Sequence, residues 1–132
     1  MDDETGRSGT RVADVVRLSV PGALEYVRIV RLTAAAVAAR LSFDVEEIED
    51  LRVAVDELVS TVIEAGDGAE VNITFTSLDG AFVVEGDSLV EREPAIDDLT
   101  RQILSVVVDA FDLTATDGVA RFRATKRSTS AE

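Results

Sequence analysis

Acid–base chemistry in this chain is expected to fall to carboxylates. The sequence contains no histidine and no cysteine, the residue types that most often supply general bases, thiol nucleophiles and zinc ligands. Any bound metal would then be a hard ion such as Mg²⁺, held by oxygen atoms. Glu57 and Thr61 are the first pair to consider, because they lie four residues apart in a run with helical periodicity and so fall on the same side of a helix.

The run from Asp44 to Ala65 is predicted to be one amphipathic helix. Its apolar residues recur at the three- and four-residue spacing of one helix face, namely Ile48, Leu51, Val55, Leu58, Val59 and Val62. Asp44 and Glu47 form the pattern of a capping box, and Gly66 follows the last turn. The helix therefore buries one side and presents carboxylates, Glu57 among them, on the other.

The stretch Ile48–Gly66, IEDLRVAVDELVSTVIEAG, resembles the glutamate-bearing helix of the GHKL (Bergerat-fold) ATPases. More narrowly, it is similar to their small anti-sigma-factor branch, serine kinases that sequester a sigma factor. In that family the Glu is the general base and an Asn four residues later binds Mg²⁺. The resemblance implies the base role for Glu57 and puts Thr61 in the Asn position, where a hydroxyl can also bind Mg²⁺. The alternatives are a solvated acid and a β-branched residue at a helix edge.

Other elements of the family's nucleotide site are altered in this sequence. The family's D-x-G-x-G motif, whose Asp bonds adenine, falls where this chain reads EGDSL at positions 85–89. Glu85 or Asp87 is the candidate for that acid, with an ordinary loop acid as the alternative. No glycine lies between Gly86 and Gly118 to build a phosphate-binding loop, and Leu89–Asp98 carries four acidic residues against one arginine. We therefore expect ATP to bind weakly or not at all.

The rest of the chain alternates strand and helix patterns in the order β-α-α-β-β-α-β-β. Strands are expected at Val12–Val20, Glu70–Ser77, Ala81–Glu85, Phe111–Thr116 and Val119–Lys126, helices at Ala23–Leu41, Asp44–Ala65 and Pro94–Ala110, and a loop at Gly86–Glu93. Asp-Gly pairs after the second and fourth strands indicate hairpins. The prediction is an α+β two-layer sandwich, a mostly antiparallel sheet with three helices on one face, in one domain over residues 12–127. Residues 1–11 and 128–132 are expected to be disordered tails.

The helix expected at Ala23–Leu41 has apolar residues on two sides. Ile29 and Leu32 lie opposite its core stripe, beside Arg28. A helix that is apolar on both sides is either buried or part of an interface, and in a two-layer domain this helix lies in the outer layer. We therefore expect Arg28, Ile29 and Leu32 to contact a protein partner, with two singly exposed aliphatic side chains as the alternative. In the family, an Arg matching Arg28 helps this helix to grip the sigma factor.

The net charge and the distribution of apolar residues restrict the partners and the location expected for this chain. A net charge of −13 argues against direct nucleic-acid binding and favours basic proteins. No apolar run approaches the ~18–20 residues of a membrane span, and the N-terminus has no apolar signal region, so a cytoplasmic location is expected. A homodimer is also expected, through an open sheet face that Val12 and Val15 would make apolar.

Three functions are compatible with the sequence. The leading interpretation is an anti-sigma-like regulator that binds a sigma factor and, by the resemblance, a STAS-type anti-anti-sigma factor. The second is an active serine protein kinase that uses ATP and Mg²⁺ to phosphorylate that antagonist. The third is an unrelated α+β interaction module.

Overall fold

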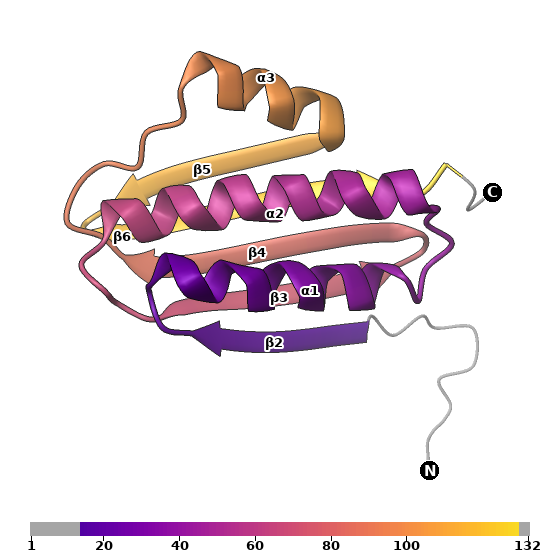
Figure 1. Cartoon of the computed structure of the whole chain (residues 1–132), viewed down its shortest axis with the longest axis horizontal. Coiled ribbons are helices and arrows are strands. Elements are labelled where there is room, and N and C mark those ends of the chain that lie inside the picture. Colours follow the sequence, from indigo (N-terminus) through magenta and orange to yellow (C-terminus); the bar gives the residue numbers. More distant parts are fainter. Residues whose placement is uncertain (1–13, 130–132) are drawn as a thin grey trace, which may run out of the picture.

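The computed structural model describes residues 14–129, which form one antiparallel sheet covered by helices on one face (Figure 1). The expected tail at residues 1–11, together with Val12 and residues 130–132, lies outside the described residues. No helix in the described part of the chain is long and apolar enough to cross a lipid bilayer.

The elements follow the predicted order of strands and helices. They are β2 (Asp14–Val20), the short 3₁₀ helix η1 (Leu24–Tyr26), α1 (Val27–Ala38), α2 (Val45–Ala65), β3 (Val71–Leu78), β4 (Ala81–Leu89), α3 (Asp98–Val107), β5 (Ala110–Thr116) and β6 (Val119–Arg127). The sheet order is β2-β3-β4-β6-β5, and every neighbouring pair is antiparallel. The predicted α+β two-layer sandwich is therefore confirmed.

The prediction was wrong about the length of β4 and of the helix that follows it. Residues 86–89, expected in a loop, continue β4, because they pair with β6 from Gly86↔Phe122 to Leu89↔Val119. The last helix was expected at Pro94–Ala110 but begins only after Asp97, whose side chain accepts a hydrogen bond from the Thr100 amide at 2.8 Å. That bond lowers the pKa of the Asp97 carboxyl.

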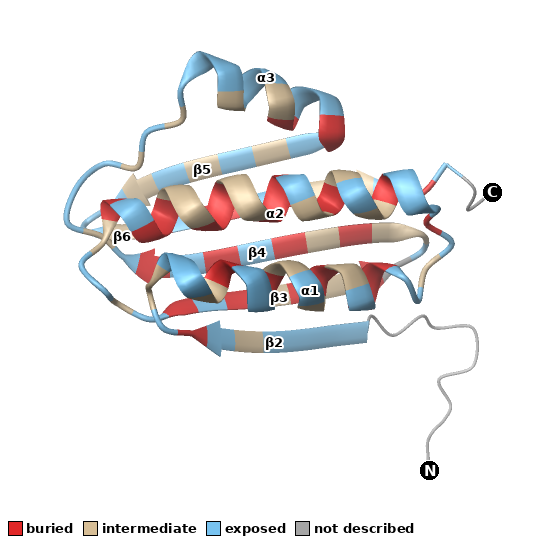
Figure 2. Cartoon of the chain, in the orientation of Figure 1, coloured by how far each residue is buried: buried red, intermediate tan, exposed pale blue. Residues whose placement is uncertain are grey.

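The core lies between α1, α2 and the central strands. Figure 2 shows buried residues concentrated there, whereas the edge strands β2 and β5 are mostly exposed or half-buried. The largest fully buried side chains come from both layers and include Phe75, Phe82, Leu51, Leu58, Ile73 and Leu104. The apolar stripe of α2 therefore faces the sheet, as its spacing predicts.

The capping box at the start of α2 is confirmed and does more than cap the helix. The Asp44 side chain accepts from the Glu47 amide at 2.8 Å, and Glu47 Oε1 accepts from the Asp44 amide at 2.9 Å. Glu47 Oε2 accepts from the amide and the hydroxyl of Thr129, each at 2.9 Å. These bonds, the Thr129 amide foremost, lower the pKa of the Glu47 carboxyl. Ser128 and Thr129, expected in a disordered tail, are therefore held against the fold.

β4 and β6 pack closely at Gly86. This glycine faces the helical layer between the buried residues Val84 and Ser88, directly opposite Phe122. A Cβ atom at position 86 would lie 2.4 Å from Cε2 and Cζ of Phe122 and 3.1 Å from the Asn72 carbonyl oxygen. The Phe122 ring, only 2% exposed, thus fills the space that the missing side chain leaves.

Replacing Gly86 by alanine should destabilise the domain by about 1–3 kcal/mol, because the new methyl group overlaps a buried ring. Denaturant unfolding of the variant and the wild type measures this difference. A Gly86→Ala/Phe122→Leu double variant should be less destabilised than the sum of its single changes. A Gly86→Ala protein with wild-type stability would show that the ring does not occupy this space.

Candidate functional site

Glu57 lies on the side of α2 that faces α3. Its Oε1 accepts a hydrogen bond from the Thr100 hydroxyl at 3.4 Å, which joins the two helices. The Thr61 hydroxyl donates to the Glu57 backbone carbonyl at 2.7 Å. Thr61 therefore uses its hydroxyl hydrogen within its own helix, a pattern common for threonine inside helices. The structure brings Glu57 and Thr61 together on one side of α2, as predicted.

The space beside these residues is small. A cavity of about 160 Å³ lies at the end of α2, lined by Thr61, Glu64, Ala65, Arg92, Glu93 and Ala95. The chain after β4 closes it, because the amides of Glu91 and Arg92 donate to the Ala65 carbonyl at 2.7 and 3.1 Å. Arg92 Nη1 donates to the Glu64 carbonyl at 2.6 Å, so its guanidinium caps the last turn of α2.

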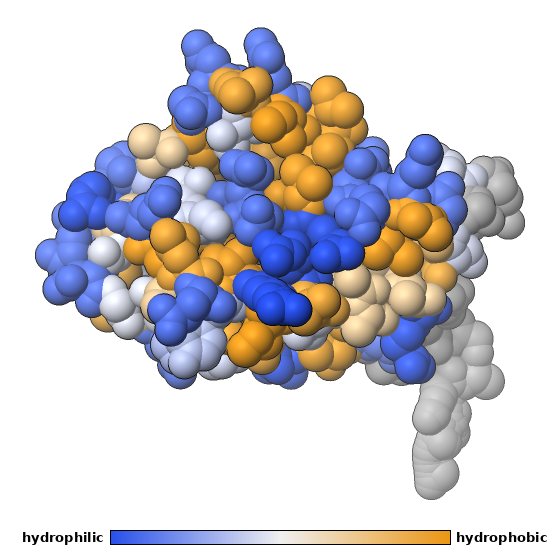
Figure 3. Space-filling model, in the orientation of Figure 1, coloured by the Kyte–Doolittle hydropathy of each residue, from blue (hydrophilic) through white to orange (hydrophobic). Residues whose placement is uncertain are grey.

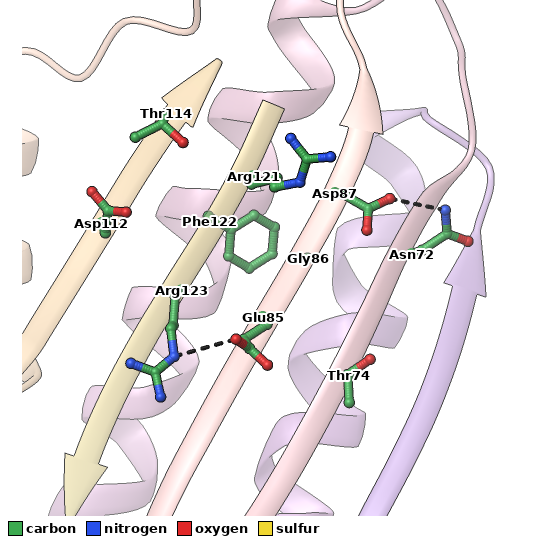
Figure 4. A pocket seen from close by; sticks show the side chains of 10 residues that line it. All are labelled: Asn72, Thr74, Glu85, Gly86, Asp87, Asp112, Thr114, Arg121, Phe122 and Arg123. Carbon is green, nitrogen blue, oxygen red and sulfur yellow. Dashed lines mark hydrogen bonds and ion pairs between the residues drawn. The ribbon is translucent and has the colours of Figure 1, made fainter. Parts of the chain in front are cut away.

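Glu85 and Asp87 do not join this site. Both project from β4 onto the face of the sheet opposite the helices, as Figure 4 shows. Glu85 pairs with Arg123 at 3.2 Å, and Asp87 accepts from the Asn72 side-chain amide at 3.2 Å. The structure therefore does not bring these two acids together with Glu57. Glu85 was expected at the end of a strand and Asp87 in a loop, and strand alternation along β4 sends both to the face opposite the helices.

The positions of β4 that do face the helices offer no carboxylate. They are Phe82, Val84, Gly86 and Ser88, all buried. The Ser88 hydroxyl donates to the Glu70 carbonyl at 3.0 Å, and the space over Gly86 is filled by Phe122. No acid from β4 is therefore available to bond adenine on the helical side.

This arrangement does not fit Mg·ATP. Pockets that hold ligands of this size measure about 300–1,000 Å³, which is about two to six times the volume of the cavity beside Thr61. Glu64 and Glu93 add negative charge where a triphosphate would lie. Among the described residues, no group of three or more acidic side chains is placed to hold a metal ion.

The larger cavity lies on the open face of the sheet. Its volume is about 430 Å³, and its lining includes Glu85, Asp87, Asp112, Arg121 and Arg123 from three strands (Figure 4). The open face that was expected to be apolar is charged at this cavity, whereas Val15 is 42% exposed on β2 and Val12 lies outside the described residues. Sequence reasoning missed this cluster, although the alternation of Arg121 and Arg123 along β6 could have indicated it.

The predicted partner-binding residues do form one exposed surface on α1. Ile29 is 45% exposed and Leu32 is 49% exposed, and Arg28 beside them is also exposed. Leu24 in η1, which the sequence analysis did not select, is 51% exposed. Arg31 is engaged with Asp56 of α2 at 3.0 Å. Figure 3 shows hydrophobic atoms over α1 next to strongly hydrophilic ones on the helical face. We call Leu24, Arg28, Ile29 and Leu32 the α1 surface.

Comparisons with known proteins agree with this fold. The chain is 37% identical over 84 residues to the serine-protein kinase RsbW of Bacillus subtilis, covering 58% of this chain and 52% of that protein. It is 39% identical over 66 residues to RsbW of Oceanobacillus iheyensis, covering 47% and 42%. The chain thus spans about half the length of the curated relatives it matches.

A solved structure gives the same architecture. The RsbU and RsbW domains of Rv1364c from Mycobacterium tuberculosis superpose with a TM-score of 0.67 at 17% identity, over 86% of this chain and 32% of that one. The model of the histidine kinase-like ATPase domain matches residues 20–126, which include both Glu57 and the α1 surface. The chain therefore belongs to the histidine kinase-like ATPase domain family, the GHKL fold that its long helix resembles.

Proposed function

We propose that this chain is an anti-sigma-like regulator that binds a sigma factor through the α1 surface and does not depend on ATP. The observation that supports this proposal is the exposure of Ile29 and Leu32, at 45% and 49%, on the helix that the family uses to grip its partner. By the same resemblance, a STAS-type anti-anti-sigma factor is the antagonist that releases the sigma factor. With these two partners, the proposed location of the protein is the cytoplasm.

The α1 surface combines exposed apolar side chains with an arginine, a combination that suits a contact with another protein. Burying Ile29 and Leu32 in a complex contributes on the order of 2–4 kcal/mol, at ~25 cal/mol per Å² of apolar area removed from water. Arg28 adds a charge-assisted hydrogen bond to a partner carboxylate, which mainly fixes the register of the complex. The acidic residues of the whole chain, with a net charge of −13, attract a partner that is basic elsewhere.

Ile29→Asp should weaken sigma-factor binding at least tenfold, because it puts a charge in the centre of the apolar contact. Its melting temperature should stay close to the wild-type value, since the side chain is 45% exposed. Isothermal titration with the cognate sigma factor measures the affinity. Val45→Asp is the matched control, because Val45 is 77% exposed at the far end of the helical layer. Unchanged binding by Ile29→Asp would move the interface elsewhere.

An active serine protein kinase is the second candidate, and Glu57 is the observation that favours it. The carboxylate is retained at the family's base position, on the side of α2 next to the small cavity. In that case Glu57 would accept the proton of the substrate serine, and Thr61 would help to hold Mg²⁺. ATP would need the 90–95 segment to move, because Arg92 and the backbone of this segment close the cavity.

A calorimetric titration with Mg·ATP separates the two candidates. We expect no saturable heat at millimolar nucleotide, because the cavity is too small and its lining is acidic. Mg²⁺ alone and ATP with EDTA serve as controls. A dissociation constant in the low micromolar range would contradict the binding-only proposal. The kinase proposal would then require that Glu57→Ala abolish phosphate transfer without unfolding the protein.

We further propose a homodimer that pairs through the open face of the sheet. The support is the self-complementary charge of that face, where Arg121 and Arg123 lie beside Glu85, Asp87 and Asp112. In a two-fold pair, the arginines of one copy can meet the carboxylates of the other.

Sedimentation at micromolar concentration should show a species of twice 14.1 kDa that dissociates as salt rises. Arg121→Glu should dissociate it by placing acids opposite acids, whereas Arg28→Glu, on the helical face, should leave it intact. A single 14.1 kDa species at low salt would rule the dimer out.

A further inference from the structure

Helix α3 presents an apolar stripe to solvent. Leu99 is 65% exposed and Val106 is 82% exposed, with the half-buried Ile103 between them. The spacing of four and three residues places all three on one side of the helix. Figure 3 shows hydrophobic atoms gathered over α3 at the top of the helical face. We call Leu99, Ile103 and Val106 the α3 stripe.

The fold does not need the exposed ends of this stripe, Leu99 and Val106, because Ile103 packs partly against the core and other residues hold α3 in place. Leu104 is fully buried and Val107 is 8% exposed, on the side of the helix that faces the core. The Thr100 hydroxyl reaches Glu57 of α2, and the Lys126 ammonium donates to the Val107 carbonyl at 2.9 Å. A helix that is already anchored and still apolar on its outer side is typical of an interface.

The charges around the stripe select the partner. From residue 91 to residue 109 there are five acidic residues and two arginines: Glu91, Glu93, Asp97, Asp98 and Asp109, with Arg92 and Arg101. The Lys126 ammonium is engaged by the Val107 carbonyl at 2.9 Å. Both arginines already have contacts, Arg92 with the end of α2 and Arg101 over the Phe111 ring at 6.0 Å. The stripe therefore lies in an acidic surrounding, which favours basic residues and disfavours a second copy of this acidic chain.

We propose that the α3 stripe docks an amphipathic helix of a partner protein, whose apolar side is flanked by lysine or arginine. The stripe extends over about two helical turns, roughly 10 Å, which matches the footprint of one helix crossing another. α1 and α3 lie on opposite sides of α2 (Figure 1). A helix on the α3 stripe therefore leaves the α1 surface free, so this site adds to the proposed sigma-factor contact and does not depend on it.

A single fluorescent reporter tests the site directly. The chain has no cysteine, so Gln102→Cys in the full chain can be labelled uniquely with an environment-sensitive dye beside the stripe. The probe is a synthetic leucine–lysine peptide of about 18 residues, five helical turns, with all leucines on one side. We expect a saturable blue shift. A scrambled peptide of equal composition, and one with glutamate in place of lysine, should give none.

Substitutions in the α3 stripe test whether the blue shift of the dye comes from peptide bound at the stripe. The Leu99→Lys/Val106→Lys variant should bind the peptide at least tenfold more weakly than the wild type. The Leu99→Ala/Val106→Ala variant should lose less affinity, but measurably. The matched control, Ile29→Lys/Leu32→Lys on α1, should bind as the wild type does. Circular dichroism checks that each variant is folded, and the alanine pair decides the outcome if the lysine pair unfolds.

Four results would overturn the proposal. The first is equal affinity for the α3 variants and the wild type, and the second is equal affinity for the scrambled peptide. The third is a blue shift that grows with protein concentration without peptide, which would make a second copy the occupant. The fourth is a reporter already shielded at nanomolar concentration and unchanged by the peptide, which would assign the stripe to the chain's own terminal segments.

Discussion

Burial of one side of α2 against the sheet is the constraint on which the rest of the structure depends. Leu51, Val55, Leu58, Val59 and Val62 are all fully buried, and together they fix the rotation of the helix about its axis. That rotation sends Glu57 toward α3 and Asp56 toward α1, where it pairs with Arg31 at 3.0 Å. The outer helices are held mainly by their own buried apolar residues, Val30 and Ala34 of α1 and Leu104 of α3, and these polar contacts lie at the flanks of that packing.

The same constraint bears on the proposal that this chain works without ATP. The packing that fixes α2 against the sheet uses its buried apolar side, which does not include Glu57, Thr61 or the Arg92 contact. Here Phe122 fills the space above Gly86, Arg92 caps α2, and Thr100 joins α3 to Glu57. Under the binding-only proposal, these contacts occupy space that a nucleotide would need, and Glu57 serves as a link between α2 and α3.

Much of this fold could be predicted from the sequence, because hydrophobic periodicity and turn chemistry are local. The spacing on α2 and the Asp-Gly hairpin signals depend only on neighbouring residues, and the structure bears them out. The extent of β4 could not be predicted in this way. Gly86, Asp87 and Ser88 read as a polar loop, and only pairing with β6 makes them a strand. Sheet pairing is non-local, so the sequence alone did not show on which face of the sheet Asp87 would lie.

The candidate surfaces show the same difference between local and non-local features of the sequence. Ile29 and Leu32 were predicted, because a helix with two apolar sides is visible in one stretch of sequence. The charged open face was not, since Arg121, Glu85 and Asp112 lie on three different strands and meet only in the folded sheet. The α3 stripe was also missed, because only the tertiary packing shows that Leu104 and Val107 face the core while Leu99 and Val106 face solvent.

Amide hydrogen exchange of this chain with its cognate sigma factor, in the absence of nucleotide, tests the central claim most directly. We predict slowed exchange across η1 and the first turns of α1, residues 24–32, with β4 and β6 unchanged. Protection that appears only after Mg·ATP is added would contradict this proposal, because sigma-factor binding would then depend on an open nucleotide site.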